Sequence, residues 1–292
     1  MRHADVPAMN GRTVVITGTN TGIGRVTAQV LAAAGARVIM LNRSRERSEQ
    51  VIADLQRTGS RFELVELDLG RLDSVRQAAD RVLELAPRID VLINNAGLAG
   101  SRGHTADGFE LAFGVNHLGH YLLTALLWPA LGAPHTRIVN VSSRAHYRAP
   151  GIPWDALQQK TPSTTGLNEY AVSKLANVLF TAELHRRTGG SPHIYALHPG
   201  VVATDVWRSI PSPLAWVARQ FMASVEDGAQ TTLHCAASPA TAADSGLYYD
   251  NCRPRTPSKW AQDPSLADEL WSRSAQWTGI APDWAGLPPG PE

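Results

Sequence analysis

The strongest constraint on the fold is a regular alternation of short apolar segments with longer amphipathic ones. The apolar segments are predicted as strands, at residues 13–17, 37–41, 62–67, 90–93, 137–141, 193–197 and 246–249. The segments between them have helical spacing, at residues 23–34, 45–57, 72–85, 105–131, 169–187 and 226–237. This alternation is typical of a parallel sheet covered on both faces. We therefore predict an α/β fold built on a doubly wound parallel sheet of about seven strands.

The length and composition of the chain fit one domain. Of its 292 residues 43% are hydrophobic, which is enough to bury a large core. The sequence contains neither an internal repeat nor a linker-like segment. We predict a single domain over residues 11–280, with a flexible N-terminus at 1–10 and a flexible, proline-rich tail at 281–292.

Charge and cysteine content indicate which partners the protein binds and in which cellular compartment it lies. The 27 basic and 26 acidic residues leave a net charge of +1, which argues against nucleic acid as the main partner. Two cysteines, Cys235 and Cys252, are too few for a disulfide framework and predict reduced thiols. The first residues lack the apolar stretch of a signal peptide, and the longest apolar run, 121–131, is too short for a bilayer. We expect a soluble, cytoplasmic protein with no membrane anchor.

Ten histidines raise the question of a metal site. The sequence has no His-Glu-x-x-His pattern and no Cys/His cluster with ligand spacing. His117 and His120, on the long helix predicted at 105–131, are expected to pack in the interior. We predict that the protein binds no metal.

The first predicted strand runs directly into a glycine-rich turn and then a helix. The glycines follow the spacing G-x-x-x-G-x-G, and the turn opens the helix predicted at 23–34. Backbone N–H groups at a helix N-terminus, together with the helix dipole, bind a pyrophosphate. The position after the first strand of a doubly wound sheet favours a dinucleotide site over a plain structural loop. The predicted contacts are Gly18, Asn20, Thr21, Gly22, Ile23 and Gly24.

The end of the second predicted strand distinguishes between two cofactors. In dinucleotide-binding folds a carboxylate about 20 residues beyond the turn holds the ribose 2′-hydroxyl of NAD. Here the sequence is Asn42-Arg43-Ser44, which contains no carboxylate. The guanidinium of Arg43 can instead pair with a 2′-phosphate. We predict NADP(H) as the cofactor, with Asn42 and Arg43 beside it; an NAD-linked dehydrogenase is the alternative.

Further motifs follow in a fixed order along the chain. They are Asp68-Leu69, Asn94-Asn95-Ala96-Gly97, Asn116, Ser142-Ser143, Tyr170-Ala-Val-Ser-Lys174 and His198-Pro199-Gly200. With the glycine turn, this ordered set resembles the short-chain dehydrogenase/reductase family over roughly residues 11–250. The segments 113–124, 174–180 and 248–252 are similar to its retinol dehydrogenase and WW-domain oxidoreductase branch. The resemblance implies a Rossmann-type fold and hydride transfer between the nicotinamide and an alcohol or carbonyl carbon.

The resemblance also implies roles for individual residues. Tyr170 is the expected acid/base, and Lys174 shares its face of the helix. A neighbouring ammonium would lower the tyrosine pKa from its usual value of about 10. Ser143 would hydrogen-bond the substrate oxygen, and Asn116 would hold a water that links Lys174 to solvent. The cofactor would lie against Asp68, Leu69, Asn95, Ala96, Gly97, Tyr170, Lys174, Pro199, Gly200, Val202 and Thr204.

The serine assignment has a competitor. Ser142 and Ser143 both follow the fifth strand, and the family pattern favours the second of them. The spacing from Ser143 to Tyr170 is longer than is common in the family. The additional stretch contains His146, Tyr147, Pro150, Pro153 and Trp154, and is predicted to form an active-site flap or an interface segment.

The predicted activity is that of an alcohol dehydrogenase or carbonyl reductase acting on a small molecule. Trp207 and Trp216 predict an apolar substrate pocket, and core packing or a subunit interface explains them equally well. A non-catalytic, dinucleotide-sensing protein is the alternative from another class. The resemblance implies a homo-oligomer assembled through the long helices, to which the stretch 122–131 would contribute, although some members of the branch are monomers.

Overall fold

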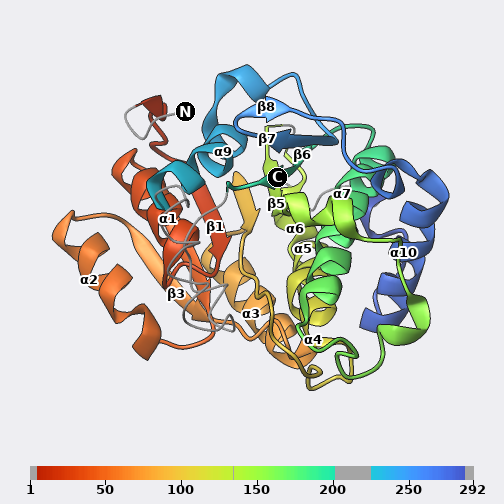
Figure 1. Cartoon of the computed structure of the whole chain (residues 1–292). Helices are drawn as coiled ribbons and strands as arrows, with labels where there is room; N and C mark the ends of the chain where they lie inside the picture. Colours follow the sequence, from red (N-terminus) through yellow and green to blue (C-terminus); the bar gives the residue numbers. More distant parts are fainter. Residues whose placement is uncertain (1–4, 134, 201–224, 287–292) are drawn as a thin grey trace.

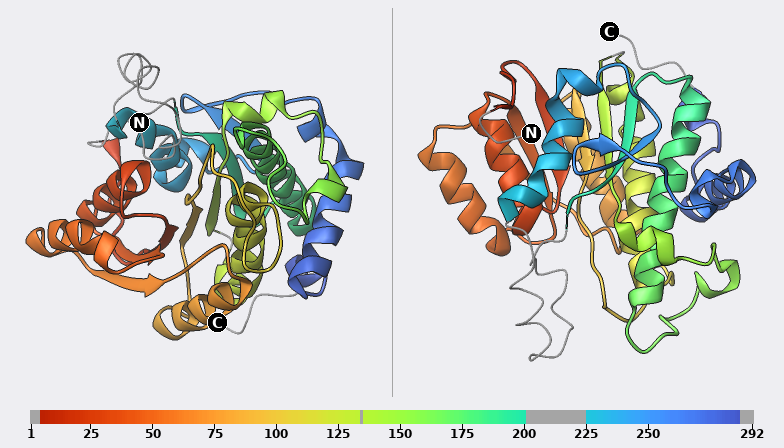
Figure 2. Two further views of the ribbon diagram at one scale, coloured as in Figure 1. Left: turned by 60° about the horizontal axis from the view of Figure 1, so that its bottom comes forward. Right: turned by 45° about the horizontal axis from the view of Figure 1, so that its top comes forward.

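The computed structural model describes residues 5–133, 135–200 and 225–286. These residues form one domain in which helices cover both faces of a central sheet (Figures 1 and 2). The strand order is β3-β2-β1-β4-β5-β6-β7-β8. Strands β1 to β7 are parallel, and the two-residue β8 pairs antiparallel with β7. The predicted doubly wound α/β fold is therefore confirmed, with one short strand added at its edge.

Each predicted strand lies within one residue of an observed one. The strands are β1 (Thr13–Thr17), β2 (Arg37–Asn42), β3 (Phe62–Glu66), β4 (Val91–Asn94), β5 (Arg137–Val141), β6 (His193–His198), β7 (Leu247–Asp250) and β8 (Arg253–Pro254). In β1, the consecutive residues Val14, Val15 and Ile16 are all fully buried. Because neighbouring side chains of a strand point to opposite faces, their burial requires a covering layer on each side of the sheet.

Two layers of helices provide that cover. One face packs against α1 (Gly22–Ala33), α2 (Glu49–Arg57) and α9 (Val225–Ala237). The other packs against α3 (Leu72–Leu85), α5 (Gly119–Leu126) and α7 (Leu167–Thr188), with α10 (Pro264–Thr278) outside α7 (Figure 1). Short helical turns connect these elements: η2 (Glu46–Ser48), η4 (Arg144–Arg148), η5 (Trp154–Ala156), η7 (Pro239–Thr241), η8 (Trp260–Gln262) and η9 (Trp284–Gly286).

The long helix predicted at residues 105–131 is interrupted, and helical structure begins only at Leu111. The observed elements are α4 (Leu111–Phe113), the π-helical turn η3 (Gly114–Leu118), α5 and α6 (Trp128–Leu131). Glu110 sets the start because its carboxylate accepts the Phe113 N–H at 2.8 Å as an N-cap. Pro129 lies in the first turn of α6, where its missing N–H costs no helical hydrogen bond.

Helix α10 was not predicted, and the packed part of the chain extends beyond the predicted end of the domain. Trp284 is buried, its ring stacks on Trp271 at 4.8 Å, and its indole N–H donates to the Tyr121 hydroxyl at 2.9 Å. At the other end, Met9 is buried and its N–H donates to Ala34 at 2.7 Å. Packing thus extends on both sides of the predicted limits at 11 and 280.

The apolar stretch proposed for subunit contact lies inside the chain's own core. Leu122, Leu123, Leu127 and Leu131 have no exposed surface in the single chain. Among the described residues, Cys235 and Cys252 are free thiols, and Cys235 is buried. No described helix combines the length and apolarity needed to cross a membrane. Within the same ranges, no three His, Cys, Asp or Glu side chains form a group able to hold a metal ion.

Candidate active site

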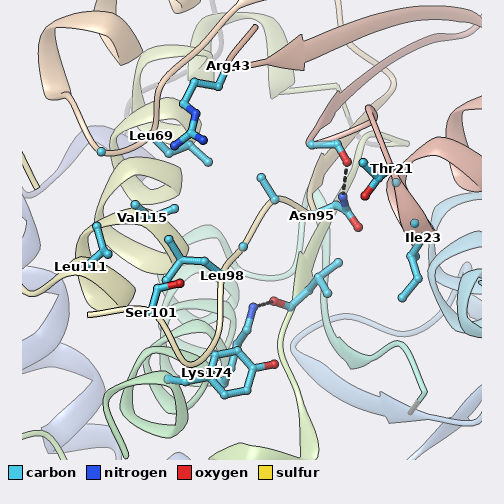
Figure 3. A pocket seen from close by; sticks show the side chains of 18 of the residues that line it. Thr21, Ile23, Arg43, Leu69, Asn95, Leu98, Ser101, Leu111, Val115 and Lys174 are labelled. Atoms are coloured by element: carbon cyan, nitrogen blue, oxygen red, sulfur yellow. Dashed lines mark hydrogen bonds between the residues drawn. The ribbon is translucent and has the colours of Figure 1, made fainter. Parts of the chain in front are cut away.

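A cleft of about 920 Å³ runs along the carboxyl ends of the central strands (Figure 3). It begins where β1 pairs with β2 on one side and β4 on the other, so that the connections diverge. Arg43 and Leu69 lie together at one end, and Lys174 lies at the other (Figure 3). The cleft therefore joins the glycine turn to the residues of η4 and α7.

The glycine turn leaves no space for side chains at two of its positions. Gly18 has a φ of +73°, and a Cβ there would lie 2.9 Å from the Cα and Cβ of Ala96. A Cβ on Gly24 would overlap the carbonyl oxygen of Gly18 and approach the Asn95 amide to 2.5 Å. The turn is thus held close to the strand beside it, with the first residues of α1 open to the cleft. This is the geometry that brings backbone N–H groups to an anionic ligand.

Thr17 and Asn95 attach the glycine turn to the end of β4. The Thr17 hydroxyl oxygen accepts the N–H groups of Asn95 and Ala96, both at 2.9 Å. The Asn95 amide donates to the carbonyl oxygens of Thr17 at 2.8 Å and Gly18 at 3.2 Å. Asn95 and Ala96 line the cleft as predicted, and Asn95 also has this positioning role, which the sequence analysis did not foresee.

Asn42 attaches the turn to the end of β2. Its carboxamide accepts the Thr19 N–H at 2.7 Å and donates to the hydroxyls of Thr19 at 2.8 Å and Ser48 at 2.9 Å. These bonds use the side chain's oxygen and both of its N–H donors. Asn42 borders the cleft, but its carboxamide holds the turn in place.

The outer end of the cleft is strongly basic. Arg43 is exposed at its wall beside Asp68 and Leu69, and Arg47 lines the same end. Neither arginine forms an ion pair with any residue that the structure describes. Among the described residues lining the cleft, Arg71, Arg144, Arg148 and Lys174 add positive charge, while Asp68 is the sole carboxylate. Arg47 was missed because an exposed arginine in a charged helical segment has no distinctive sequence signal.

Ser142 and Ser143 face different partners. The Ser142 hydroxyl donates to the Lys174 carbonyl oxygen at 2.7 Å and is buried. Ser143 hydrogen-bonds the Tyr170 side chain, and its hydroxyl oxygen also accepts the Ala145 N–H at 3.2 Å. The structure therefore brings Ser143 to Tyr170 and turns Ser142 away, toward the backbone of α7.

Tyr170 and Lys174 lie at the inner end of the cleft, one turn apart on α7. The Lys174 ammonium donates to the Val141 carbonyl oxygen at 2.9 Å, and burial lowers the pKa of Lys174 to about 7. Burial raises the pKa of Tyr170, and the hydrogen bond from Ser143 opposes that rise. The expected lowering of the Tyr170 pKa by Lys174 is therefore wrong for this arrangement, because burial dominates at both groups.

Asn116 occupies the π-helical turn η3 and is completely buried. Its carboxamide accepts the Leu98 N–H at 2.9 Å and donates to the Leu98 carbonyl at 3.0 Å and the Ser173 hydroxyl at 2.9 Å. Its backbone carbonyl oxygen accepts from His120 Nδ1 at 3.0 Å. The carboxamide therefore holds the turn against Leu98 and Ser173, and its two N–H groups are already used.

His120 connects this turn with the glycine turn. Its Nε2 lies 2.9 Å from the Thr17 hydroxyl, which already accepts two N–H groups and must donate its proton to the ring. The ring proton is thus on Nδ1, where it bonds the Asn116 carbonyl. Burial lowers the pKa of His120 to about 4, which keeps this neutral form. The expectation that His117 and His120 pack in the interior is confirmed, since both are buried.

Other predicted residues line the cleft as expected, and two cannot be placed. Gly97, Pro199 and Gly200 all border it. A Cβ on Gly97 would lie 3.2 Å from the Asn116 carboxamide oxygen and 3.4 Å from the Lys174 ammonium. Val202 and Thr204, together with Trp207 and Trp216, lie outside the described residues.

Comparisons with known proteins identify the family. Residues 12–156 match the family profile described as short chain dehydrogenase. Human retinol dehydrogenase 14 is 41% identical, with 96% of this chain and 90% of the relative covered. The chain belongs to the short-chain dehydrogenase/reductase family. Human retinol dehydrogenase 11 is 42% identical, with 94% of this chain and 87% of the relative covered.

Solved structures of other proteins have a similar fold. A protein from Mycobacterium paratuberculosis superposes with a TM-score of 0.78 at 36% identity, covering 96% of this chain and 98% of the other. A short-chain dehydrogenase from Escherichia coli CFT073, crystallised with NADPH, has a TM-score of 0.67 at 24% identity, with 84% of this chain and 98% of the other covered. At that identity the second likeness shows the fold alone.

Membership in the short-chain dehydrogenase/reductase family makes the chain an oxidoreductase of small molecules that uses a nicotinamide dinucleotide. The glycine turn and the basic outer end fit the pyrophosphate and phosphates of such a cofactor. Ser143, Tyr170 and Lys174 lie together at the inner end of the same cleft.

Proposed function

We propose that this chain is an NADP(H)-dependent oxidoreductase that interconverts an apolar alcohol and its aldehyde or ketone. One observation carries the proposal: Ser143 hydrogen-bonds Tyr170, with Lys174 one turn away, at the inner end of a cleft that begins at a glycine turn. A protein that only senses a dinucleotide would not need this constellation.

The residues have separate tasks in the proposed reaction. The bound cofactor supplies or accepts the hydride. Tyr170 donates its proton to the carbonyl oxygen during reduction and takes it back during oxidation. Burial keeps the phenol protonated near neutral pH, which suits proton donation. Ser143 steadies the substrate oxygen as charge develops on it. Lys174, when protonated, would offset part of the burial that disfavours the Tyr170 phenolate.

The choice of NADP(H) rests on Arg43 and Arg47. Both line the outer end of the cleft, and no carboxylate occupies the end of β2 where NAD-selective folds carry one. A 2′-phosphate there would receive charge-assisted hydrogen bonds from guanidinium groups. An NAD-linked dehydrogenase is the competing proposal.

The substrate proposal rests on the lining and on the relatives. Leu98, Leu111 and Ala145 give the inner part of the cleft apolar surface. Several relatives are named retinol dehydrogenases, and retinol is an apolar alcohol. We propose a substrate of that polarity without naming it, and a cytoplasmic location for the enzyme.

The first experiment measures NADPH oxidation by the purified protein with a panel of aldehydes and ketones. Turnover should fall by at least a hundredfold in Tyr170→Phe, with NADPH affinity unchanged. Turnover that survives this substitution would overturn the acid/base assignment. Tight NADPH binding with no turnover on any carbonyl compound would favour the dinucleotide-sensing protein instead.

The second experiment compares the dissociation constants of NADPH and NADH. We expect NADPH to bind more tightly, and Arg43→Ala to weaken NADPH binding by about tenfold to a hundredfold while changing NADH binding little. Arg45→Ala is the matched control, because Arg45 is also exposed but does not line the cleft. Equal affinities for the two cofactors in the native protein would contradict the NADP(H) assignment.

A further inference from the structure

Two buried histidines hold the peptide group that follows Ser143. The carbonyl oxygen of Ser143 lies 2.7 Å from His146 Nδ1. On the other side of the same peptide, the Arg144 N–H points to His198 Nδ1 at 3.4 Å. His146 has no exposed surface, and His198 is 5% exposed. One peptide group is therefore bonded to an imidazole at each end.

The polarity of each imidazole follows from its hydrogen bonds. His146 uses both ring nitrogens, whereas His198 bonds only through Nδ1, and its buried Nε2 has no partner among the described residues. His146 Nε2 lies 3.1 Å from the backbone N–H of Ser258, which can only donate, so Nε2 accepts and the ring proton is on Nδ1. His198 Nδ1 accepts from Arg144, which places the ring proton of His198 on Nε2. His146 thus donates to the peptide oxygen, and His198 accepts from the peptide nitrogen.

The held peptide constrains the backbone from which the Ser143 side chain projects. Ser143 is extended, with φ of −166° and ψ of 156°, and directly precedes η4. Its ψ angle is the rotation that relates its side chain to the plane of the following peptide. Holding that plane restricts ψ of Ser143 and with it the direction of the Cα–Cβ bond, from which the hydroxyl reaches Tyr170.

We propose that His146 and His198 are positioning residues that hold the Ser143–Arg144 peptide and thereby keep the Ser143 hydroxyl in place for the substrate oxygen. The proposal rests on the function proposed for Ser143 above. Neither histidine touches the reacting atoms in this assignment. Both act through the peptide that follows the serine.

The surroundings of both rings favour the neutral forms that this arrangement requires. The ring of His146 packs against Tyr147 at 4.0 Å and Tyr248 at 4.7 Å, and burial lowers its pKa. The charged neighbours of His198 are Arg144 and Asp250, which pair with each other through two hydrogen bonds. Burial lowers the pKa of His198 to about 4. A second proton on His198 would occupy Nδ1, the atom that accepts from Arg144.

Asparagine and glutamine provide matched variants because each reproduces a different ring nitrogen. An asparagine amide lies near the position of Nδ1, whereas the longer glutamine amide reaches the position of Nε2. His146→Asn retains a donor for Ser143 and loses the acceptor for Ser258, whereas His146→Gln does the reverse. In the same way, His198→Asn retains an acceptor for Arg144, and His198→Gln does not.

The kinetic test measures carbonyl reduction in these four variants, alone and combined with Ser143→Ala. We expect each glutamine variant to lose about tenfold in kcat and each asparagine variant to lose less, with the Kd for NADPH unchanged. In the Ser143→Ala background the glutamine substitutions should lower kcat by less than about twofold, because the hydroxyl through which they act is already missing. Equal losses with and without Ser143, or better retention by His146→Gln than by His146→Asn, would overturn the proposal.

A second measurement does not depend on turnover. The Arg144 amide should exchange its hydrogen slowly in the native protein and in His198→Asn, and at least tenfold faster in His198→Gln. Unchanged exchange in His198→Gln would remove His198 from the arrangement. If the native protein shows slow exchange but no turnover on any carbonyl compound, the proposed function fails and so does the assignment of a catalytic purpose to these histidines.

Discussion

The ammonium nitrogen of Lys174 lies 5.6 Å from the centre of the Tyr170 ring and is bonded to the backbone of β5 rather than to the phenol. Its position is set by Val141, whose carbonyl oxygen also accepts from the Asn177 carboxamide at 3.2 Å. The end of β5 therefore aligns the lysine while the ring of Tyr170 reaches Ser143. The end of the strand that precedes the serine thus also holds Lys174 in place.

The burial of Lys174 should lower the stability of the folded chain near neutral pH. Its pKa is about 7 in the folded chain against 10.5 for an ordinary lysine. Between these values the unfolded chain binds a proton that the folded chain does not, so stability rises with pH across this window. Lys174→Met should therefore raise the free energy of unfolding at pH 7 by at least about 1 kcal/mol, the equivalent of one unit of pKa shift. Urea unfolding at pH 7 and at pH 9.5 measures the difference, which should narrow at the higher pH. If the difference in unfolding free energy between Lys174→Met and the native protein widened with pH, Lys174 would not be the source of the pH dependence.

The two serines should respond differently to substitution. Ser143→Ala should lower kcat by about a hundredfold or more, because it removes a hydroxyl aimed at developing charge. Ser142→Ala should mainly affect stability, by about 1 kcal/mol, because it loses the hydrogen bond to the Lys174 carbonyl. Steady-state kinetics and thermal melting of both variants provide the comparison. Loss of activity in Ser142→Ala with activity retained in Ser143→Ala would reverse the assignment.

Buried neutral histidines should make the fold sensitive to acid. Burial lowers the pKa of His117 to about 3 and of His120 and His198 to about 4, from 6.5. As the pH falls from 6.5 toward 4, the histidines of the unfolded chain bind protons and those of the folded chain do not, so the free energy of unfolding decreases. Chemical unfolding at several pH values should show this slope.

The variant His117→Leu tests that explanation. It removes one of the three groups, so the pH dependence between 6.5 and 4 should become shallower. His135→Gln, a substitution at an exposed histidine, is the control and should leave the slope as in the native protein. An unchanged slope in His117→Leu would exclude that residue as a source of the acid sensitivity.

The aromatic contacts of Trp284 should contribute strongly to stability. Its ring is 4% exposed and packs against Trp271, Trp128 and Tyr121. Trp284→Ala should lower the free energy of unfolding by about 3–5 kcal/mol, as is usual for a large buried aromatic side chain. Trp260→Ala is the matched control, because Trp260 is 43% exposed and should cost much less. Similar losses in both variants, measured by urea unfolding, would contradict the packing described for this end of the chain.

The strands and the cofactor turn could be predicted from sequence because their signals are local. Strands such as β1 and β5 are short, mostly apolar segments, and the glycine turn is marked by the spacing of its own glycines. The paired positions of Tyr170 and Lys174 followed from helical spacing alone.

The features that could not be predicted depend on contacts between residues that are distant in the sequence. Helix α10 has a weak amphipathic pattern, and it forms where it packs on α7. The choice between Ser142 and Ser143 depends on which hydroxyl faces α7, and neighbouring serines give no local signal of this. The positions of Arg47 and His198 in the cleft likewise appear only once the strands are side by side.

The packing of Trp284 on Tyr121 also constrains the order of events during synthesis. The two side chains are 163 positions apart, and the later one lies close to the last residue described. Until the segment that carries Trp284 has been synthesised, the aromatic face formed by α5 and α7 lacks this contact. Domains generally fold as units during synthesis, and uncovered apolar surface attracts other chains. A nascent chain that stops before Trp284 would therefore expose this aromatic surface and become a target for chaperones or proteases.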